Sequence, residues 1–282
     1  MNTTTEGTSS IAQDRARWSR HRHQFAEELE RLPIPRDSSD ATPLHEGELT
    51  ALPEPARRYL CAMGALDRPR DWSLCAHWRG RFRRGPDEAW RAVEAWQYNS
   101  AVEVARVFHM HFPMGGVLPV YVRDTYLSGH GRMLGRVLDL IPVVDATGDA
   151  LDQGELVTWL NDAVLLAPSM LLRPEVTWSP LDERSFELAL TDAGHTVRAR
   201  VFLDALGRPC DFSTTDRFVE DPFTPKHPLV RARWSTPVEG FETVEGRCVP
   251  RRGKAVWHLP QREFAYADLE LASISWNVTP GA

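Results

Sequence analysis

The most constraining feature of this sequence is one well-marked helix, in the stretch DQGELVTWLNDAVLLAPSMLLRPEVTW from Asp152 to Trp178. Asp152 suits the cap of the helix, because Glu155 follows three residues later as in a capping box. Pro168 ends the helix, because proline cannot continue it. Apolar residues recur at steps of three and four and predict one apolar stripe: Leu156, Leu160, Ala163, Val164 and Ala167.

A second face of this helix carries two acids. Glu155, Trp159 and Asp162 follow each other at i, i+4 and i+7, which places two carboxylates beside an indole. In one interpretation Glu155 only caps the helix and Asp162 is solvated. In the other, this face closes a pocket and one of the acids acts on a ligand.

The regions on either side of the helix predict β-strands. Short alternating segments are separated by turns about every ten residues, which is typical of a strongly curved antiparallel sheet. One strand places Val104, Arg106, Phe108, Met110 and Phe112 on one face, with Val107, His109 and His111 on the other. The predicted strands are residues 72–82, 90–98, 104–114, 119–127, 132–144, 185–190, 195–203, 208–218, 231–241, 246–260 and 264–278.

The predicted fold is therefore α+β: a half-barrel, barrel-like or calyx sheet packed with a few helices, plus an N-terminal helical extension. Residues 1–47 are predicted to be this extension and a linker, and residues 48–282 a single β-rich domain with a ligand cavity. The extension is expected to be helical from Ile11 to Leu32. Its narrow apolar stripe would dock on the main body or form a homodimer with a second subunit: Trp18, Phe25, Leu29 and Leu32.

Composition excludes several classes of function. The chain has 282 residues and a net charge of −6, so electrostatics give a nucleic-acid partner no support. No apolar run approaches the roughly 20 residues that span a bilayer, and the N-terminus lacks the apolar core of a signal peptide. We therefore expect no membrane insertion and a cytoplasmic location. Lys226 and Lys254 are the only lysines among many arginines, which suggests a GC-rich, actinobacterial genome.

Motifs for metals, cofactors and activated nucleophiles are missing from the sequence. His109 and His111 share a strand face, as metal ligands do, but residues 112–122 offer no third ligand. The alternative is a pair of core or pocket histidines. Neither a G-x-S-x-G motif nor a P-loop is present, and the glycines at 129, 131 and 135 have the wrong spacing for a dinucleotide. We predict neither a metal nor a cofactor.

Several motifs together resemble those of a bacterial family of unknown function, DUF6544, also filed as DUF6920. They run in order from about residue 52 to the end: LPEPARRYL, VRDTYLSGHGRML, VVDATGDALDQGEL, WLNDAVLLAPSMLL, DFSTTDRF, RWSTPV, VPRRGKAVWHLP and LELASISWNV. The matching positions are Asp124, Tyr126, Gly129, Gly131, Glu155, Asp162, Asp216, Arg217, Trp234, Trp257 and Asn277. The resemblance implies an architecture similar to half-barrel lipoprotein carriers of the LolA type, but it assigns no residue a catalytic role. Many relatives look membrane-attached at the N-terminus, where this chain has a polar helical extension.

The leading functional hypothesis is a cofactor-independent enzyme that cyclises, isomerises or dehydrates a hydrophobic, polyketide- or terpenoid-like intermediate of bacterial secondary metabolism. The residues expected to act chemically are Asp124, Tyr126, Glu155 and Asp162. Those expected to line the cavity are His109, His111, Trp159, Trp178, Arg217, Trp234 and Trp257. The alternatives are a non-catalytic carrier of a lipid or other lipophilic ligand, and a partner-binding protein that docks through its N-terminal helix. In either case Asp124, Tyr126 and Arg217 would form a buried structural network.

Overall fold

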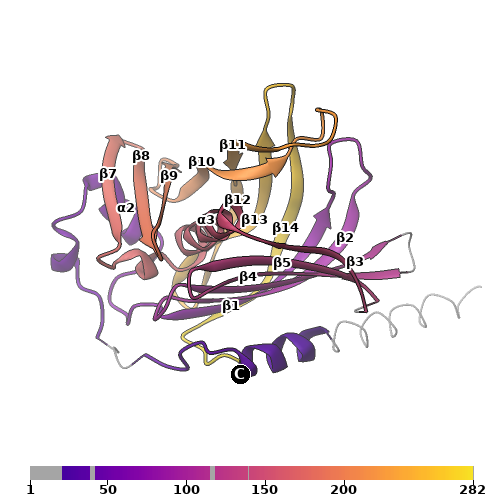
Figure 1. Ribbon diagram of the computed structural model, residues 1–282. Helices are drawn as coiled ribbons and strands as arrows, with labels where there is room; N and C mark the ends of the chain where they lie inside the picture. The colour runs from indigo at the N-terminus through magenta and orange to yellow at the C-terminus, as the bar shows by residue number, and fades with distance from the viewer. Residues whose placement is uncertain (1–20, 39–41, 115–117, 139, 282) are drawn as a thin grey trace, which may run out of the picture.

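The computed structural model describes residues 21–38, 42–114, 118–138 and 140–281. Within these residues, fourteen strands form one antiparallel sheet that curls around helix α3 (Asp149–Leu166) (Figure 1). The predicted α+β fold with a strongly curved sheet is thus confirmed. No described helix is long and apolar enough to cross a membrane.

The sheet has the strand order β6-β5-β4-β3-β2-β1-β14-β13-β11-β10-β9-β8-β7, and β12 pairs with β13 beside this path. Most neighbours in the sheet are neighbours in the chain. The exception that joins the two halves is the pairing of β1 with β14, from Leu74 opposite Trp276 to Phe82 opposite Ala267. The strands are β1 (Ser73–Phe82), β2 (Arg91–Ser100), β3 (Ala105–Met114), β4 (Leu118–Leu127), β5 (His130–Val137), β6 (Ile141–Thr147), β7 (Val176–Asp182), β8 (Ser185–Asp192), β9 (His195–Leu203), β10 (Pro209–Glu220), β11 (Leu229–Ser235), β12 (Val238–Val244), β13 (Arg247–His258) and β14 (Glu263–Trp276).

Three strand predictions were wrong in detail. The segment 132–144 is two strands, because Leu138 takes a positive φ of 56° and turns the chain between β5 and β6. The segment 231–241 is also two strands, separated at Pro237, which lacks an N–H for pairing. Trp178 lies in β7, a strand that the sequence did not predict.

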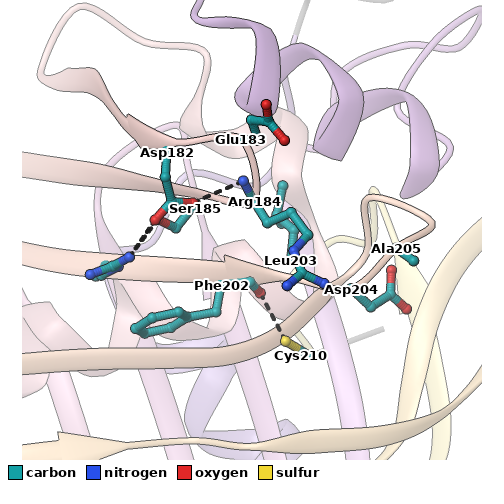
Figure 2. A pocket seen from close by; sticks show the side chains of 10 residues that line it. Asp182, Glu183, Arg184, Ser185, Phe202, Leu203, Asp204, Ala205 and Cys210 are labelled. Atoms are coloured by element: carbon teal, nitrogen blue, oxygen red, sulfur yellow. Dashed lines mark hydrogen bonds and ion pairs between the residues drawn. The ribbon is translucent and has the colours of Figure 1, made fainter.

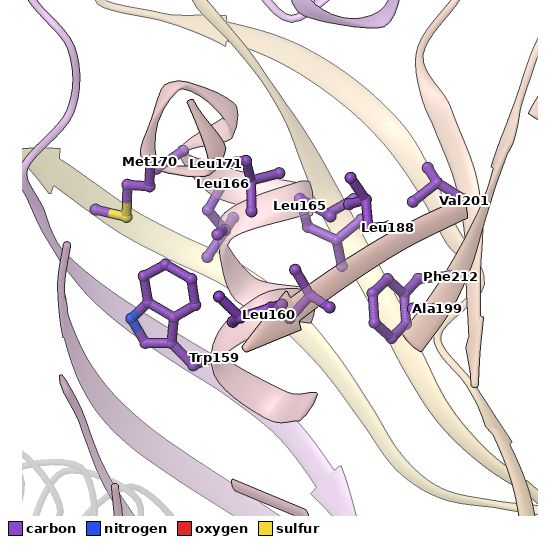
Figure 3. Packing of buried hydrophobic residues seen from close by; sticks show 14 of the residues in the cluster. Trp159, Leu160, Leu165, Leu166, Met170, Leu171, Leu188, Ala199, Val201 and Phe212 are labelled. Atoms are coloured by element: carbon purple, nitrogen blue, oxygen red, sulfur yellow. The ribbon is translucent and has the colours of Figure 1, made fainter. Parts of the chain in front are cut away.

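Helix α3 starts earlier than expected and is buried on more than one face. It begins at Asp149 after Gly148, so Asp152 is not the cap. The Asp152 carboxylate instead accepts a hydrogen bond from the backbone N–H of Gly131 at 2.7 Å, which ties the helix to β5. The expected single apolar stripe was too narrow a prediction, since the acid-bearing face is buried as well. Figure 3 shows the apolar side packed against strands of the second half of the sheet.

The two halves of the sheet meet at one end through their hairpin turns. The Tyr126 hydroxyl of β4 donates to the Asp192 carboxylate of β8 at 2.7 Å. A methyl group added to Gly129 would lie 2.2 Å from the Cβ of Ala193, so the β4–β5 turn touches the β8–β9 turn. These contacts close the curl of the sheet around α3 at this end.

The N-terminal segment packs on the outer face of the sheet. Residues 21–31 are helical, and Phe25, Leu29 and Ile34 are buried against Trp96 and Val107 of β2 and β3. The stripe therefore docks on the main body, while the position of Trp18 lies outside the described residues. The remaining short elements are η1 (Glu46–Leu49), α2 (Glu54–Ala62) and η2 (Pro168–Leu171).

The predicted linker contributes to the main core. Leu44 is 1% exposed and belongs to the same apolar cluster as the residues of α3. Chain upstream of residue 48 therefore packs with the β-rich domain.

Candidate functional site

A buried arginine of β3 joins two of the predicted acids on α3. Arg106 donates from Nε to Asp162 Oδ2 at 2.8 Å and from Nη1 to Glu155 Oε2 at 3.0 Å. The side chains of Arg106, Glu155 and Asp162 are 5%, 2% and 11% exposed. The interpretation of Glu155 as a mere capping acid and of Asp162 as a solvated one was therefore wrong.

A second arginine reaches one of these acids, Glu155, from the opposite half of the sheet. The Nη2 of Arg217, on β10, lies 3.8 Å from Glu155 Oε1. Its guanidinium lies 4.4 Å from the ring centre of Trp234, a cation–π distance. The Trp234 indole donates to the Tyr266 hydroxyl at 3.1 Å, and Tyr266 stacks on Trp257 with ring centres 6.1 Å apart. Three predicted ligand residues, Arg217, Trp234 and Trp257, thus lie together, and Arg217 links them to Glu155.

Asp124 of β4 completes this group of charges. Burial raises the pKa of Asp124 to about 7, and the negative charge of Glu155 adds to this effect, while Arg106 and Arg217 oppose it. The side chain as a whole is half-buried, but its Oδ1 is buried and accepts no hydrogen bond from any residue that the structure describes. Burial also raises the pKa of Asp162, against the influence of Arg106. We call these five residues the Arg106 cluster: Arg106, Asp124, Glu155, Asp162 and Arg217.

A chain of hydrogen bonds holds Asp162 in place from the other side. Asn99 donates to Asp162 Oδ2 at 3.2 Å, Gln97 donates to Asn99 at 3.0 Å, and the Trp78 indole donates to Gln97 at 2.9 Å. These side chains come from β1 and β2 and fix the orientation of the carboxylate. The sequence did not point to them or to Arg106. The available signal for Arg106 was its position as the one charged residue on an otherwise apolar strand face.

Beyond the cluster, the same face of the sheet is apolar. Side chains alternate along a strand, so Phe108, Met110 and Phe112 of β3 face the same side as Arg106. Phe112 is six residues from Arg106, which corresponds to about 20 Å along the strand. We call this region the apolar strip: Phe82, Met110, Val122 and Leu269, half-buried, over buried Val93, Phe112, Val120 and Val137.

Aromatic rings connect the cluster to the apolar strip. Tyr266 meets the ring of Phe82 edge-on at 6.2 Å, and Phe82 lies 5.7 Å from Phe112. On the concave side of the sheet, the charged Arg106 cluster is thus followed by the apolar strip.

Three predicted site residues lie elsewhere in the interior. The hydroxyl of Tyr126 is bound to Asp192, as described above. Trp159 is fully buried, and its indole donates to the backbone carbonyl of Ser100 at 2.9 Å. Trp178 packs 5.4 Å from Phe186, on β7 and β8. None of these contacts involves the Arg106 cluster.

His109 and His111 lie on the outer face of the sheet, under the N-terminal helix. His109 Nε2 is 2.9 Å from Glu28 Oε2, and His111 stacks on His21 with ring centres 4.4 Å apart. They border a hollow of about 500 Å³ between this helix and the sheet. Among the described residues, no three His, Cys, Asp or Glu side chains are grouped so that they could hold a metal ion.

A further hollow of about 700 Å³ contains none of the predicted residues (Figure 2). Two of its acids are already paired, since Asp182 binds Arg200 and Asp204 binds Arg208, each at 2.7 Å. Burial raises the pKa of the Cys210 thiol, which lowers its reactivity. Its lining consists of Asp182, Glu183, Arg184, Ser185, Arg200, Phe202, Leu203, Asp204, Ala205 and Cys210.

Comparisons with solved structures give remote similarities. A LolA superfamily protein from Nitrosomonas europaea is 14% identical, with a TM-score of 0.40 over 78% of this chain and 92% of its own. A putative outer membrane lipoprotein-sorting protein domain from Vibrio parahaemolyticus is 9% identical, with a TM-score of 0.37 over 72% and 85%. A DUF1329 family protein from Desulfovibrio piger is 11% identical, with a TM-score of 0.37 over 74% and 87%.

These similarities are too remote to assign a role to this chain, and its fold is defined by its own sheet order and register. No curated protein matches the chain significantly. A family model does match, over residues 42–269, and this range includes all five residues of the Arg106 cluster. The chain therefore belongs to DUF6544, a family of unknown function.

Proposed function

We propose that this protein is a non-catalytic binding protein or carrier that holds a lipophilic molecule on the concave side of its sheet. The observation that carries the proposal is the apolar strip, whose half-buried side chains line the inside of a curved sheet next to a buried charged cluster. Contiguous apolar surface on a folded protein marks a binding site for an apolar partner. A ligand with a long apolar part and one polar group matches this arrangement.

The curvature of the sheet favours a small molecule as the ligand over a partner with a flat binding surface. Ligand sites are concave and mostly apolar, with a few placed polar groups that fix the orientation. Here Phe82, Met110 and Val122 would contact the apolar part, and Asp124 and Arg217 would receive the polar part.

The test is native mass spectrometry of protein purified from its own host, with analysis of the organic extract. We expect a bound lipophilic compound. The variant Met110→Glu places a charge in the apolar strip and should lose that compound. Leu206→Glu makes a similar change at a side chain that is 66% exposed, and should keep it. Retention of the compound by Met110→Glu, with both variants folded, would refute the proposed site.

Asp124 favours a second candidate, a cofactor-independent cyclase, isomerase or dehydratase acting on the bound polyketide- or terpenoid-like molecule. Burial raises the pKa of Asp124 to about 7. A carboxyl group with such a pKa can both take and give a proton near neutral pH. Because its Oδ1 has no partner among the described residues, it would be available to a substrate.

The two candidates differ in the effect of one substitution. If the protein is an enzyme, incubation with an acyclic or earlier precursor of the extracted compound yields product, and Asp124→Asn abolishes turnover while binding persists. If it is a carrier, no product forms with either protein. Asp145→Asn is the matched control, because Asp145 lies in an exposed ion pair on β6.

A further inference from the structure

Asp124 and Arg217 are the members of the Arg106 cluster whose hydrogen-bonding capacity is left unused. The Oδ1 of Asp124 and the Nε of Arg217 are both buried, and neither bonds to a described residue. Arg106, by contrast, uses its Nε and Nη1 on Asp162 and Glu155. Buried polar groups without partners are unfavourable, so a ligand group that satisfies both atoms gains affinity here.

Both residues interact with Glu155. The Nη2 of Arg217 lies 3.8 Å from Glu155 Oε1. Burial raises the pKa of Asp124, the charge of Glu155 adds to this effect, and the charge of Arg217 opposes it. Arg217 lies against Trp234 and, more distantly, Trp257. One unsatisfied acceptor and one unsatisfied donor therefore belong to residues that share Glu155 as a neighbour, and aromatic rings pack against the donor.

The charges of the cluster disfavour an ionic ligand. Arg106 and Arg217 balance Glu155 and Asp162, and Asp124 adds a negative charge when it is ionised. An added carboxylate or phosphate would place one more negative charge beside three buried acids, with a large desolvation cost. A protonated amine would lie beside two guanidinium groups and has no acceptor for the Nε of Arg217.

We infer that the ligand of the concave side carries an uncharged hydroxyl group, which donates to Asp124 and accepts from Arg217, so that the protein selects lipophilic alcohols over fatty acids, amines and phospholipids. A hydroxyl group is suited to this pair because it is a donor and an acceptor at once. This inference rests on the proposed lipophilic binding and adds the chemical class of the ligand.

The experiment is a binding comparison of four probes with the same alkyl chain, measured by calorimetry on the full chain at neutral pH. They are dodecan-1-ol, dodecyl methyl ether, dodecanoate and dodecylammonium. Hydrogen bonds to charged partners predict that the alcohol binds about tenfold or more tightly than the ether, which cannot donate. The alcohol should also bind more tightly than dodecanoate and dodecylammonium.

Two variants assign the preference to the cluster. In Asp124→Leu the advantage of the alcohol over the ether should disappear, while the affinity for the ether stays the same. Arg217→Met should also weaken binding of the alcohol. This variant provides a second test if Asp124→Leu does not fold. Asp145→Leu, at an exposed acid, should leave all four affinities unchanged.

Each outcome separates the two proposals. If the alcohol and ether bind equally, or an ion binds as tightly as the alcohol, the hydroxyl inference is overturned and lipophilic binding stands. If no probe binds at any concentration used, the proposed function fails and the inference fails with it.

Discussion

Removal of the Arg106 guanidinium should strongly destabilise the fold. Arg106→Met keeps the length of the side chain but leaves Glu155 and Asp162 as buried carboxylates, with Arg217 at 3.8 Å as the nearest remaining ion-pair partner of Glu155. Two charge-assisted hydrogen bonds are lost, each worth about 1.5–3 kcal/mol. Breaking a buried ion pair from one side costs about 3–5 kcal/mol, so we expect a loss in this range.

The measurement is urea unfolding followed by circular dichroism, with Arg132→Met as the matched control. Arg132 also makes two hydrogen bonds to one acid, at 2.9 Å to each oxygen of Asp145, but both side chains are about half exposed. Surface pairs of this kind contribute little, so the control should unfold like the wild type.

The destabilisation by Arg106→Met should also depend on pH. Burial already raises the pKa of Asp162 against the influence of Arg106, so loss of the guanidinium raises this pKa further. The deficit is then present at neutral pH and shrinks as pH falls and Asp162 becomes protonated. The charge-free triple variant Arg106→Met/Glu155→Gln/Asp162→Asn should recover part of the loss. If Arg106→Met is no less stable than Arg132→Met, the buried ion-pair argument is wrong.

Three further predictions concern single residues. The pKa of Asp124 is about 7 in the folded protein, against an ordinary value of 3.8. The free energy of unfolding should therefore fall as pH rises between these two values, by up to about 1.4 kcal/mol per pH unit. Unfolding curves of Asp124→Asn should lack this pH dependence. Tyr126→Phe loses the bond to Asp192 and should lower the free energy of unfolding by about 1–2 kcal/mol, whereas an unchanged midpoint would show that the hairpin contact is irrelevant. Gly131→Ala puts a methyl 2.5 Å from the Leu151 carbonyl oxygen and should cost about 1–3 kcal/mol in thermal melts, while Gly154→Ala, whose nearest neighbour is 3.9 Å away, should be tolerated.

Local patterns were sufficient to predict most of the sheet, because a strand that pairs with its sequence neighbour needs only alternation and a turn. The SFELAL and HTVRARVFL segments pair as β8 and β9 around a turn with Ala193 and Gly194 at positive φ, as the spacing predicts. The pairing of β1 with β14 joins Leu74 to Trp276, about 200 positions later in the chain, and no local signal encodes it. The curl of the sheet follows from that closure, and so does the depth at which α3 is buried.

The candidate site was predicted in part, and the errors have one physical origin. A period of two tells which residues share a strand face, but it does not tell what that face meets at each position. Asp124 and Tyr126 do share a face, yet Asp124 meets the Arg106 cluster while Tyr126 reaches Asp192 on a hairpin of the other half. The acids on α3 were identified from their spacing, but their partner, Arg106, lies 49 residues from Glu155 in the chain.

The outer face shows the same limit. His109 and His111 were correctly placed on the side of β3 opposite Arg106, but the element that covers them was not predicted. That element is the N-terminal helix, with Phe25 at 5.2 Å from the His109 ring. Glu28 forms an ion pair with Arg123, and its other carboxylate oxygen lies 2.9 Å from His109 Nε2. The docking of this helix therefore depends on one apolar contact surface and one charged contact.

This docking leads to a prediction that separates a folded-back helix from a dimer contact. Phe25 and Leu29 are 3% and 2% exposed within one chain, so the stripe that would join two subunits is already covered. The double variant Phe25→Ala/Leu29→Ala should lower the free energy of unfolding by about 5 kcal/mol, the sum of the lower ends for a buried Phe and a buried Leu, because this cluster is small. Its molecular mass in light scattering should equal that of the wild type. A halved mass with unchanged stability would instead show that the helix joins two subunits.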